Sequence, residues 1–163
     1  MPATREMLFC HLEALAIATT TVSHPPVFTV EEARVLRGAV PGAHIKNLFL
    51  KDKKAVLWLV VCEEDAAIDL KALPAVIGSA RLSFGRPELL REVLGIEPGS
   101  VTPFALINDR QRRVNVILDA RILAADRVNC HPLVNTATTT IATGDLMAFI
   151  ASTGHVPKIV DFT

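Results

Sequence analysis

The sequence predicts a mixed α/β (α+β) fold, in which helices pack around a mixed, largely antiparallel sheet. Two pairs of β-favouring segments, each joined by a short polar turn, predict two β-hairpins. Capped helical segments are scattered between these pairs, an arrangement that argues against a doubly wound parallel sheet. The chain has 163 residues, half of them hydrophobic, so we expect one globular domain over residues 1–163.

The two predicted hairpins carry most of the expected sheet. They join 47–50 to 55–61 and 104–107 to 113–119, across polar turns at 51–54 and 108–111. In the second hairpin Val114, Val116 and Leu118 alternate with other residues, which is typical of a strand with one apolar face. Further strands are predicted at 135–143, a β-branched threonine-rich segment, and at 158–162.

Helices are predicted from capping residues and from apolar spacing. Thr4 can cap a helix over 5–16, and leucines at 8, 12 and 15 recur on one face of it. Pro87 and Gly95 are typical first and terminating residues of a helix, which predicts a helix over 87–94. Further helices are predicted at 30–37, from a capping box, at 69–77 and at 146–152.

Charge and cysteine content exclude several classes of protein. Lysine plus arginine equals aspartate plus glutamate at 17 each, so the chain lacks the basic excess of non-specific nucleic-acid binders. Any RNA contact should be local, and no DNA binding is expected. Cys10, Cys62 and Cys130 contain no Cys-x-x-Cys pair, a pattern that suits a reducing cytosol and argues against structural zinc.

No targeting or membrane segment is predicted. Glu6 and Glu13 interrupt what would be the apolar core of a signal peptide. The longest apolar run, 55–62, is far shorter than the roughly twenty residues of a membrane helix. We therefore expect a cytoplasmic protein without a membrane partner.

Three features carry candidate chemistry. The segment 99–103, Gly-Ser-Val-Thr-Pro, can present successive N–H groups to a carbonyl or anionic oxygen, but it also fits an ordinary turn. Lys46 can hold a phosphate or a developing oxyanion, or it can be a solvated surface lysine. His131 can line a pocket or sit in the core. A Cys130–His131 dyad is disfavoured because neighbouring residues of an extended segment point to opposite faces.

Four segments together resemble the YbaK/ProX family of tRNA editing domains. They are HIKNLFLKD at 44–52, GSVTP at 99–103, HPLVNTATT at 131–139 and TGH at 153–155. Free-standing alanyl-tRNA(Pro) deacylases are the most similar members. The resemblance implies a curved, barrel-like mixed sheet, and hydrolysis of a mischarged aminoacyl ester without a metal, a cofactor or an acyl-enzyme intermediate.

The resemblance also implies roles for individual residues. Lys46, Gly99 and His131 correspond to functional positions of the family. Substrate-binding positions correspond to Asn47, Ser100, Val101, Thr102 and Pro103. The acceptor end of tRNA(Pro) is the implied partner, and prolyl-tRNA synthetase is a candidate second one.

A mechanism follows as a hypothesis. The amides of 100–102 orient the ester and its oxyanion, Lys46 fixes the terminal nucleotide or stabilises charge, and water attacks with help from the ribose hydroxyl. His131 shapes a pocket that admits alanine and excludes the proline ring. Two alternatives stay open, a cysteinyl- or seryl-tRNA deacylase of the same family and a non-catalytic module that binds aminoacyl-tRNA or a synthetase.

Overall fold

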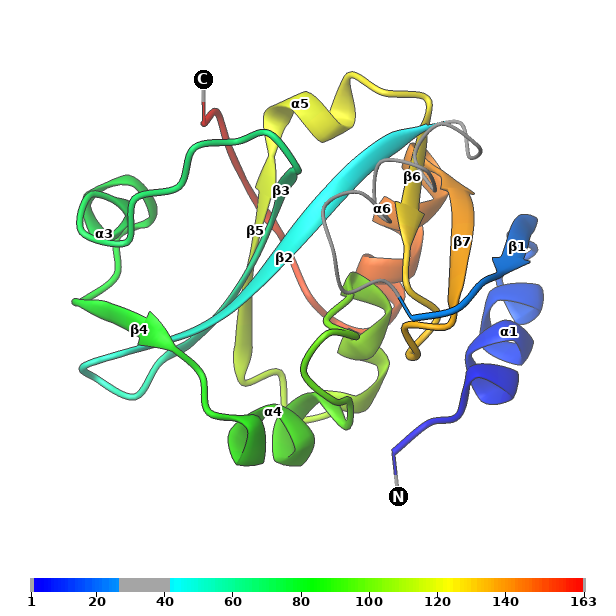
Figure 1. Cartoon of the computed structure of the whole chain (residues 1–163), viewed down its shortest axis with the longest axis horizontal. Helices are drawn as coiled ribbons and strands as arrows, with labels where there is room; N and C mark the ends of the chain where they lie inside the picture. Colours follow the sequence, from blue (N-terminus) through cyan, green and yellow to red (C-terminus); the bar gives the residue numbers. More distant parts are fainter. Residues whose placement is uncertain (1, 27–41, 163) are drawn as a thin grey trace.

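The computed structural model describes residues 2–26 and 42–162, and the helix predicted at 30–37 lies outside them. Within the described residues the strands are β1 (Thr19–Ser23), β2 (Ala43–Asp52), β3 (Leu57–Glu63), β4 (Leu82–Phe84), β5 (Val114–Asp119), β6 (Arg127–Cys130), β7 (Ala137–Ala142) and β8 (Lys158–Val160). They form one sheet in the order β1-β7-β6-β2-β3-β5-β8, and β4 pairs with β2 off this path. Figure 1 shows β2 crossing the molecule between two halves of this sheet.

The sheet is mixed, as predicted. The β2–β3, β2–β4, β6–β7 and β1–β7 pairs are antiparallel, whereas the β2–β6, β3–β5 and β5–β8 pairs are parallel. Strand β2 pairs with β6 only through its first residues and with β3 along most of its length. The sheet therefore changes direction along β2, which gives it the expected curvature.

Helices cover the sheet where the sequence has caps and apolar faces. They are α1 (Arg5–Ala14), α3 (Leu73–Ile77), α4 (Pro87–Leu94), α5 (Ala120–Leu123), α6 (Thr143–Ser152) and the 3-10 helix η1 (Pro103–Asn108). The Thr4 hydroxyl accepts a hydrogen bond from the Met7 amide, as its capping role requires. The helix over 87–94 has its predicted bounds, and Gly95 ends it with a φ of 63°.

The first predicted hairpin is confirmed, and it divides the apolar interior into two clusters. Phe49 and Val61 point to a large cluster that includes side chains of α1, α4, η1 and α6. Leu50 and Val60 point to a smaller cluster beside α3. Side chains alternate along a strand, so the odd-numbered residues of β2 face the large cluster and the even-numbered ones the opposite side.

The second predicted hairpin is wrong. Residues 104–107 belong to η1, whose start is capped by the Thr102 hydroxyl, and Pro103 is its first residue. The carboxylate of Asp109 then accepts hydrogen bonds from the amides of Arg113 and Val114 and turns the chain into β5. Strand β5 lies between β3 and β8 and runs parallel to both, so neither neighbour forms a hairpin with it, because a hairpin needs an antiparallel pair.

The helix predicted at 69–77 is shorter than expected. The side chain of Asp69 accepts a hydrogen bond from the Lys71 amide and forms a turn, and α3 begins only at Leu73. Proline has no amide hydrogen and fits the first turn of a helix, so Pro74 marks the start of α3 rather than its interior. Strands β1, β4 and β6 and helix α5 were not predicted.

Candidate functional site

One face of the sheet carries polar side chains from three neighbouring strands. His44 of β2 is the register partner of Asn129 in β6, and Asn129 is the partner of Thr140 in β7. Register partners point to the same side of a sheet. The Thr140 hydroxyl donates a hydrogen bond of 2.6 Å to the side-chain oxygen of Asn129, and both residues are buried. We call this surface the polar face.

Two histidines extend the polar face toward β1. His24 follows the last residue of β1, and its Nε2 lies 2.8 Å from the hydroxyl of Thr138, which points to the same side as Thr140. His131 follows β6, and its Nδ1 lies 3.2 Å from the carbonyl oxygen of Ala137. Burial, together with the charge of the nearby His24, lowers the pKa of His131, and the hydrogen bond to Ala137 only partly opposes this.

The hydrogen bond to Ala137 and the lowered pKa together define the protonation state of His131. A carbonyl oxygen only accepts, so Nδ1 of His131 must carry the hydrogen that it donates to Ala137. Because its pKa lies below the usual value, the ring is neutral at pH 7, and its lone pair is on Nε2. The ring therefore offers a hydrogen-bond acceptor at Nε2.

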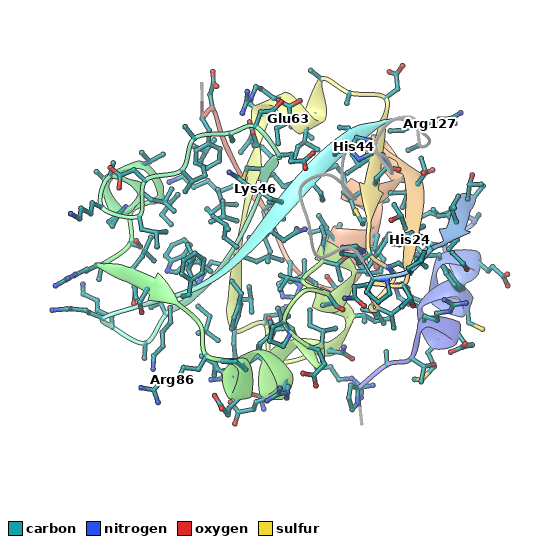
Figure 2. All side chains as sticks on the ribbon, in the orientation of Figure 1. His24, His44, Lys46, Glu63, Arg86 and Arg127 are labelled. Carbon is teal, nitrogen blue, oxygen red and sulfur yellow. The ribbon has the colours of Figure 1, made fainter. Side chains whose placement is uncertain are left out.

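Lys46 lies on the same face as these groups. It follows His44 by two residues in β2, just as His131, the first residue after β6, follows Asn129 by two residues. The parallel pairing of the two strands ends at His44 and Asn129. The Lys46 ammonium donates a hydrogen bond to the carbonyl oxygen of Ala66. Figure 2 shows Lys46 and His44 along β2, with Arg127 near β6 and His24 near β1.

Asn47 points the other way. It alternates with Lys46 and lies on the side of Phe49 and Val61, which belong to the large apolar cluster. Its side-chain oxygen is buried and has no hydrogen-bond partner within the described residues. The structure thus does not bring the Asn47 side chain together with Lys46, and a substrate-binding role for it stays a prediction.

The 99–103 loop lies beside the segment that follows His131. Gly99 has a φ of 92°, and a Cβ added there would approach the Asn135 side-chain nitrogen to 3.7 Å. The Ser100 amide donates to the carbonyl of Glu97 and is therefore already occupied. The amides of Val101 and Thr102 form no hydrogen bond with any described residue, so these two remain as candidates to orient an oxygen.

The other predicted loop residues hold the loop in place. Val101 packs against the large apolar cluster. Thr102 and Pro103 are buried and form the start of η1. The buried Ser100 side chain and the exposed backbone of Gly99 complete the turn. Four residues of the polar face were not predicted: His24, Asn129, Thr138 and Thr140. A local signal exists only for the two threonines, which alternate within 135–143.

Two features are absent from the described residues. No group of three or more His, Cys, Asp or Glu side chains in residues 2–26 and 42–162 is arranged to hold a metal ion. Among the helices of the same residues, none has the length and hydropathy needed to cross a membrane.

Comparison with known proteins identifies the family. A family model described as "Aminoacyl-tRNA editing domain" matches residues 24–149, which include His24, Lys46, the 99–103 loop and His131. The chain belongs to the aminoacyl-tRNA editing domain family. The predicted resemblance is therefore confirmed at the level of the family.

Relatives extend this result to nearly the whole chain, and a solved structure has a similar fold. The chain is 34% identical to "Prolyl-tRNA editing protein ProX" of Acetoanaerobium sticklandii, over 96% of both proteins. It is 40% identical to "Prolyl-tRNA synthetase associated domain-containing protein 1" of Bos taurus, over 97% of this chain and 95% of the relative. The crystal structure of a proposed trans-editing enzyme for prolyl tRNA synthetase superposes with a TM-score of 0.71 at 21% identity, over 99% of each chain. That last likeness concerns the fold.

Proposed function

We propose that this editing domain hydrolyses alanine from mischarged tRNA(Pro), acting in trans as one domain over its whole length. The family assignment supports the editing of an aminoacyl-tRNA, and the name of the bacterial relative supports the prolyl system. The observation that carries the proposal is the placement of Lys46 and of the neutral His131 on one polar face, at the point where β2 and β6 separate.

Lys46 binds the terminal nucleotide in this proposal. An ammonium group has three N–H donors, and within the described residues one of them is used by Ala66. The other two can reach a phosphate or a ribose oxygen. Such charge-assisted hydrogen bonds are worth about 1.5–3 kcal/mol each.

The 99–103 loop orients the ester. The amides of Val101 and Thr102 donate to the carbonyl oxygen and to the oxyanion that forms when water attacks it. The Ser100 amide is excluded from this role because Glu97 occupies it. This narrows the three amides expected from the sequence to two.

His131 shapes the amino-acid pocket and does not act as a general base. Its lowered pKa makes it a weak base, and its hydrogen bond to Ala137 fixes the ring. The attacking water is instead positioned by the ribose hydroxyl of the substrate. In this proposal the site beside the ring admits alanine and excludes the larger proline ring, so the correct product is spared.

The test is the deacylation rate of the purified protein with alanyl-, seryl-, cysteinyl- and prolyl-tRNA(Pro). We expect rapid loss of alanine, intact prolyl-tRNA(Pro), and a strong dependence on Lys46, measured with Lys46→Ala. Lys158→Ala, in the exposed edge strand β8, is the matched control and should keep the wild-type rate.

Other outcomes of this assay would support alternative functions. Preference for the seryl or cysteinyl ester would give the domain a different substrate of the same class. Tight binding of all four tRNAs without hydrolysis would make it a binding module. Addition of prolyl-tRNA synthetase to the assay tests the second candidate partner, which is suggested by the name of the mammalian relative.

A further inference from the structure

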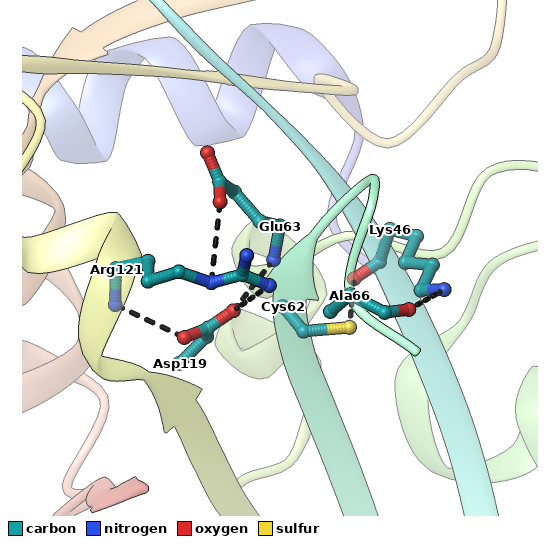
Figure 3. Close-up of polar contacts among 6 residues, drawn as sticks. All are labelled: Lys46, Cys62, Glu63, Ala66, Asp119 and Arg121. Carbon is teal, nitrogen blue, oxygen red and sulfur yellow. Dashed lines mark hydrogen bonds and ion pairs between the residues drawn. The ribbon is translucent and has the colours of Figure 1, made fainter. Parts of the chain in front are cut away.

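A buried carboxylate lies behind the residue that holds Lys46. Asp119, the last residue of β5, has no exposed surface. Its two oxygens accept hydrogen bonds of 3.0 Å from the amides of Glu63 and Arg121 and a longer one of 3.4 Å from the Arg121 guanidinium. Figure 3 shows this cluster beside the Lys46 ammonium and the carbonyl of Ala66.

The contact with Glu63 reaches Lys46 through a single turn. Glu63 ends β3, and its carbonyl accepts a hydrogen bond of 2.9 Å from the amide of Ala66, which closes the turn 63–66. Ala66 is buried, and its own carbonyl accepts from the Lys46 ammonium. The chain of contacts therefore runs from the Asp119 carboxylate through the turn 63–66 to Lys46.

The Arg121 side chain forms a second contact with the turn 63–66, through the side chain of Glu63. Its Nε lies 3.3 Å from a carboxylate oxygen of Glu63, although the N–H is not aligned for a hydrogen bond. Both side chains are about one third exposed, so this ion pair is weak. The buried carboxylate of Asp119, which binds two backbone amides, is the stronger constraint.

Cys62 lies close to Lys46 and interacts electrostatically with Asp119 and Arg121. It is the register partner of Lys46, and its thiol lies 3.8 Å from the Lys46 carbonyl oxygen. Burial raises the pKa of Cys62 to about 11, Lys46 and Arg121 oppose the rise, and Asp119 adds to it. The thiol thus stays protonated and neutral at pH 7 between the Lys46 cation and the Asp119 carboxylate.

We propose that Asp119 is a positioning residue, which fixes the turn 63–66 so that the Ala66 carbonyl holds the Lys46 ammonium in place for the terminal nucleotide. This inference rests on the proposed function, because it takes Lys46 as the group that binds the substrate. Nothing in it requires Asp119 to touch the tRNA.

The test is a double-mutant cycle on deacylation of Ala-tRNA(Pro). Asp119→Asn removes the charge and turns an N–H group toward a backbone N–H, so the turn 63–66 should shift. We expect KM to rise roughly 10- to 100-fold in the wild-type background, with kcat nearly unchanged. In the Lys46→Ala background the same change should have less than about a twofold effect, because the group it positions is absent.

A second buried aspartate provides the matched control. Asp52 is buried at the other end of β2, about 20 Å along the strand from Lys46, and it accepts hydrogen bonds from the amides of Lys54, Val56 and Ala80. Asp52→Asn should destabilise the fold comparably, and its effect on deacylation should be the same with or without Lys46. Equal effects of Asp119→Asn in both backgrounds would overturn the inference.

A readout without catalysis separates this inference from the proposed function. The 15Nζ resonance of the Lys46 ammonium should shift or broaden in Asp119→Asn and stay in place in Asp52→Asn. An unchanged resonance in Asp119→Asn overturns the positioning role even if the enzyme is active. Wild-type deacylation by Lys46→Ala would instead refute the role of the lysine. If Asp119→Asn does not fold, Arg121→Gln replaces it. This variant should give a smaller rise in KM that also depends on Lys46, and a smaller change in the Lys46 resonance.

Discussion

Replacement of Gly99 by alanine should separate the function of the 99–103 loop from its contribution to stability. Gly99 has a φ of 92°, where an L-residue is strained, and a Cβ there would meet only the Asn135 side chain, at an ordinary distance of 3.7 Å. The cost in the free energy of unfolding is therefore that of the backbone alone, about 1–2 kcal/mol. For a domain of this size that corresponds to roughly 2–4 °C in Tm for each kcal/mol.

Gly78 is the control for this strain. It ends α3 with a φ of 78°, and a Cβ added there would have no neighbour within 4 Å. Gly78→Ala should lower Tm by a similar amount, because the backbone penalty is of the same kind. It lies outside the proposed site, so the deacylation rate should not change.

Gly99→Ala should in addition slow deacylation of Ala-tRNA(Pro) by roughly a hundredfold, because a shift of the Val101 and Thr102 amides misplaces the donors to the oxyanion. The rate is measured under single-turnover conditions, and Tm is measured on the same samples. If Gly99→Ala kept the wild-type rate while losing the expected stability, the loop would have no part in the reaction. Equal losses of rate in both variants would show that strain alone slows the enzyme.

Three further outcomes are expected. Lys46→Ala should reduce kcat/KM about 10- to 150-fold, which corresponds to the free energy of one charge-assisted hydrogen bond, about 1.5–3 kcal/mol. An unchanged kcat/KM would contradict the binding role of Lys46. Burial by itself would raise the pKa of Asp109, but hydrogen bonds led by that from His155 outweigh it and hold the pKa below its usual value. This contribution to the free energy of unfolding is present above the unfolded pKa of about 3.9 and is lost as pH falls through the folded pKa. The free energy of unfolding in urea should therefore decrease between about pH 6 and about pH 3, and His155→Gln should make this decrease smaller. Phe149→Ala should cost about 3–5 kcal/mol in urea unfolding, because this ring is fully buried and packs edge-on against Phe104.

Local signals in the sequence were enough for the elements whose ends are set by local contacts. The β2–β3 hairpin and the helix over 87–94 were predicted because a polar turn, a proline and a glycine mark their ends. The segment 104–107 was misassigned because its apolar residues favour a strand, whereas the Thr102 cap and the turn made by Asp109 favour η1. Strand β1 has no apolar pattern of its own and forms only by pairing with β7, far along the chain.

The candidate site was predicted as a set of residues, but its geometry was not. The register that places Lys46 and His131 on one face of the sheet joins His44 to Asn129, which lie far apart in sequence. The same alternation sends Asn47 to the opposite face of β2. The occupation of the Ser100 amide by Glu97 also depends on a turn that the sequence pattern did not reveal.

Three buried aspartates connect the stability of this fold to its proposed chemistry. Asp52, Asp109 and Asp119 each lie at the end of a strand or of η1, and each accepts hydrogen bonds from backbone amides that the sheet leaves without partners. Buried amides need partners, so short strands with tight turns favour such carboxylates. Asp119 lies next to the proposed site, behind the turn that holds Lys46, whereas Asp109 lies at the far end of η1 from the 99–103 loop. Burial alone would raise the pKa of Asp52 and of Asp109, but the hydrogen bonds that these carboxylates accept outweigh it and lower both pKa values. Acid that protonates these two carboxylates should therefore destabilise the fold, and loss of deacylation on acidification should follow loss of structure rather than the titration of His131.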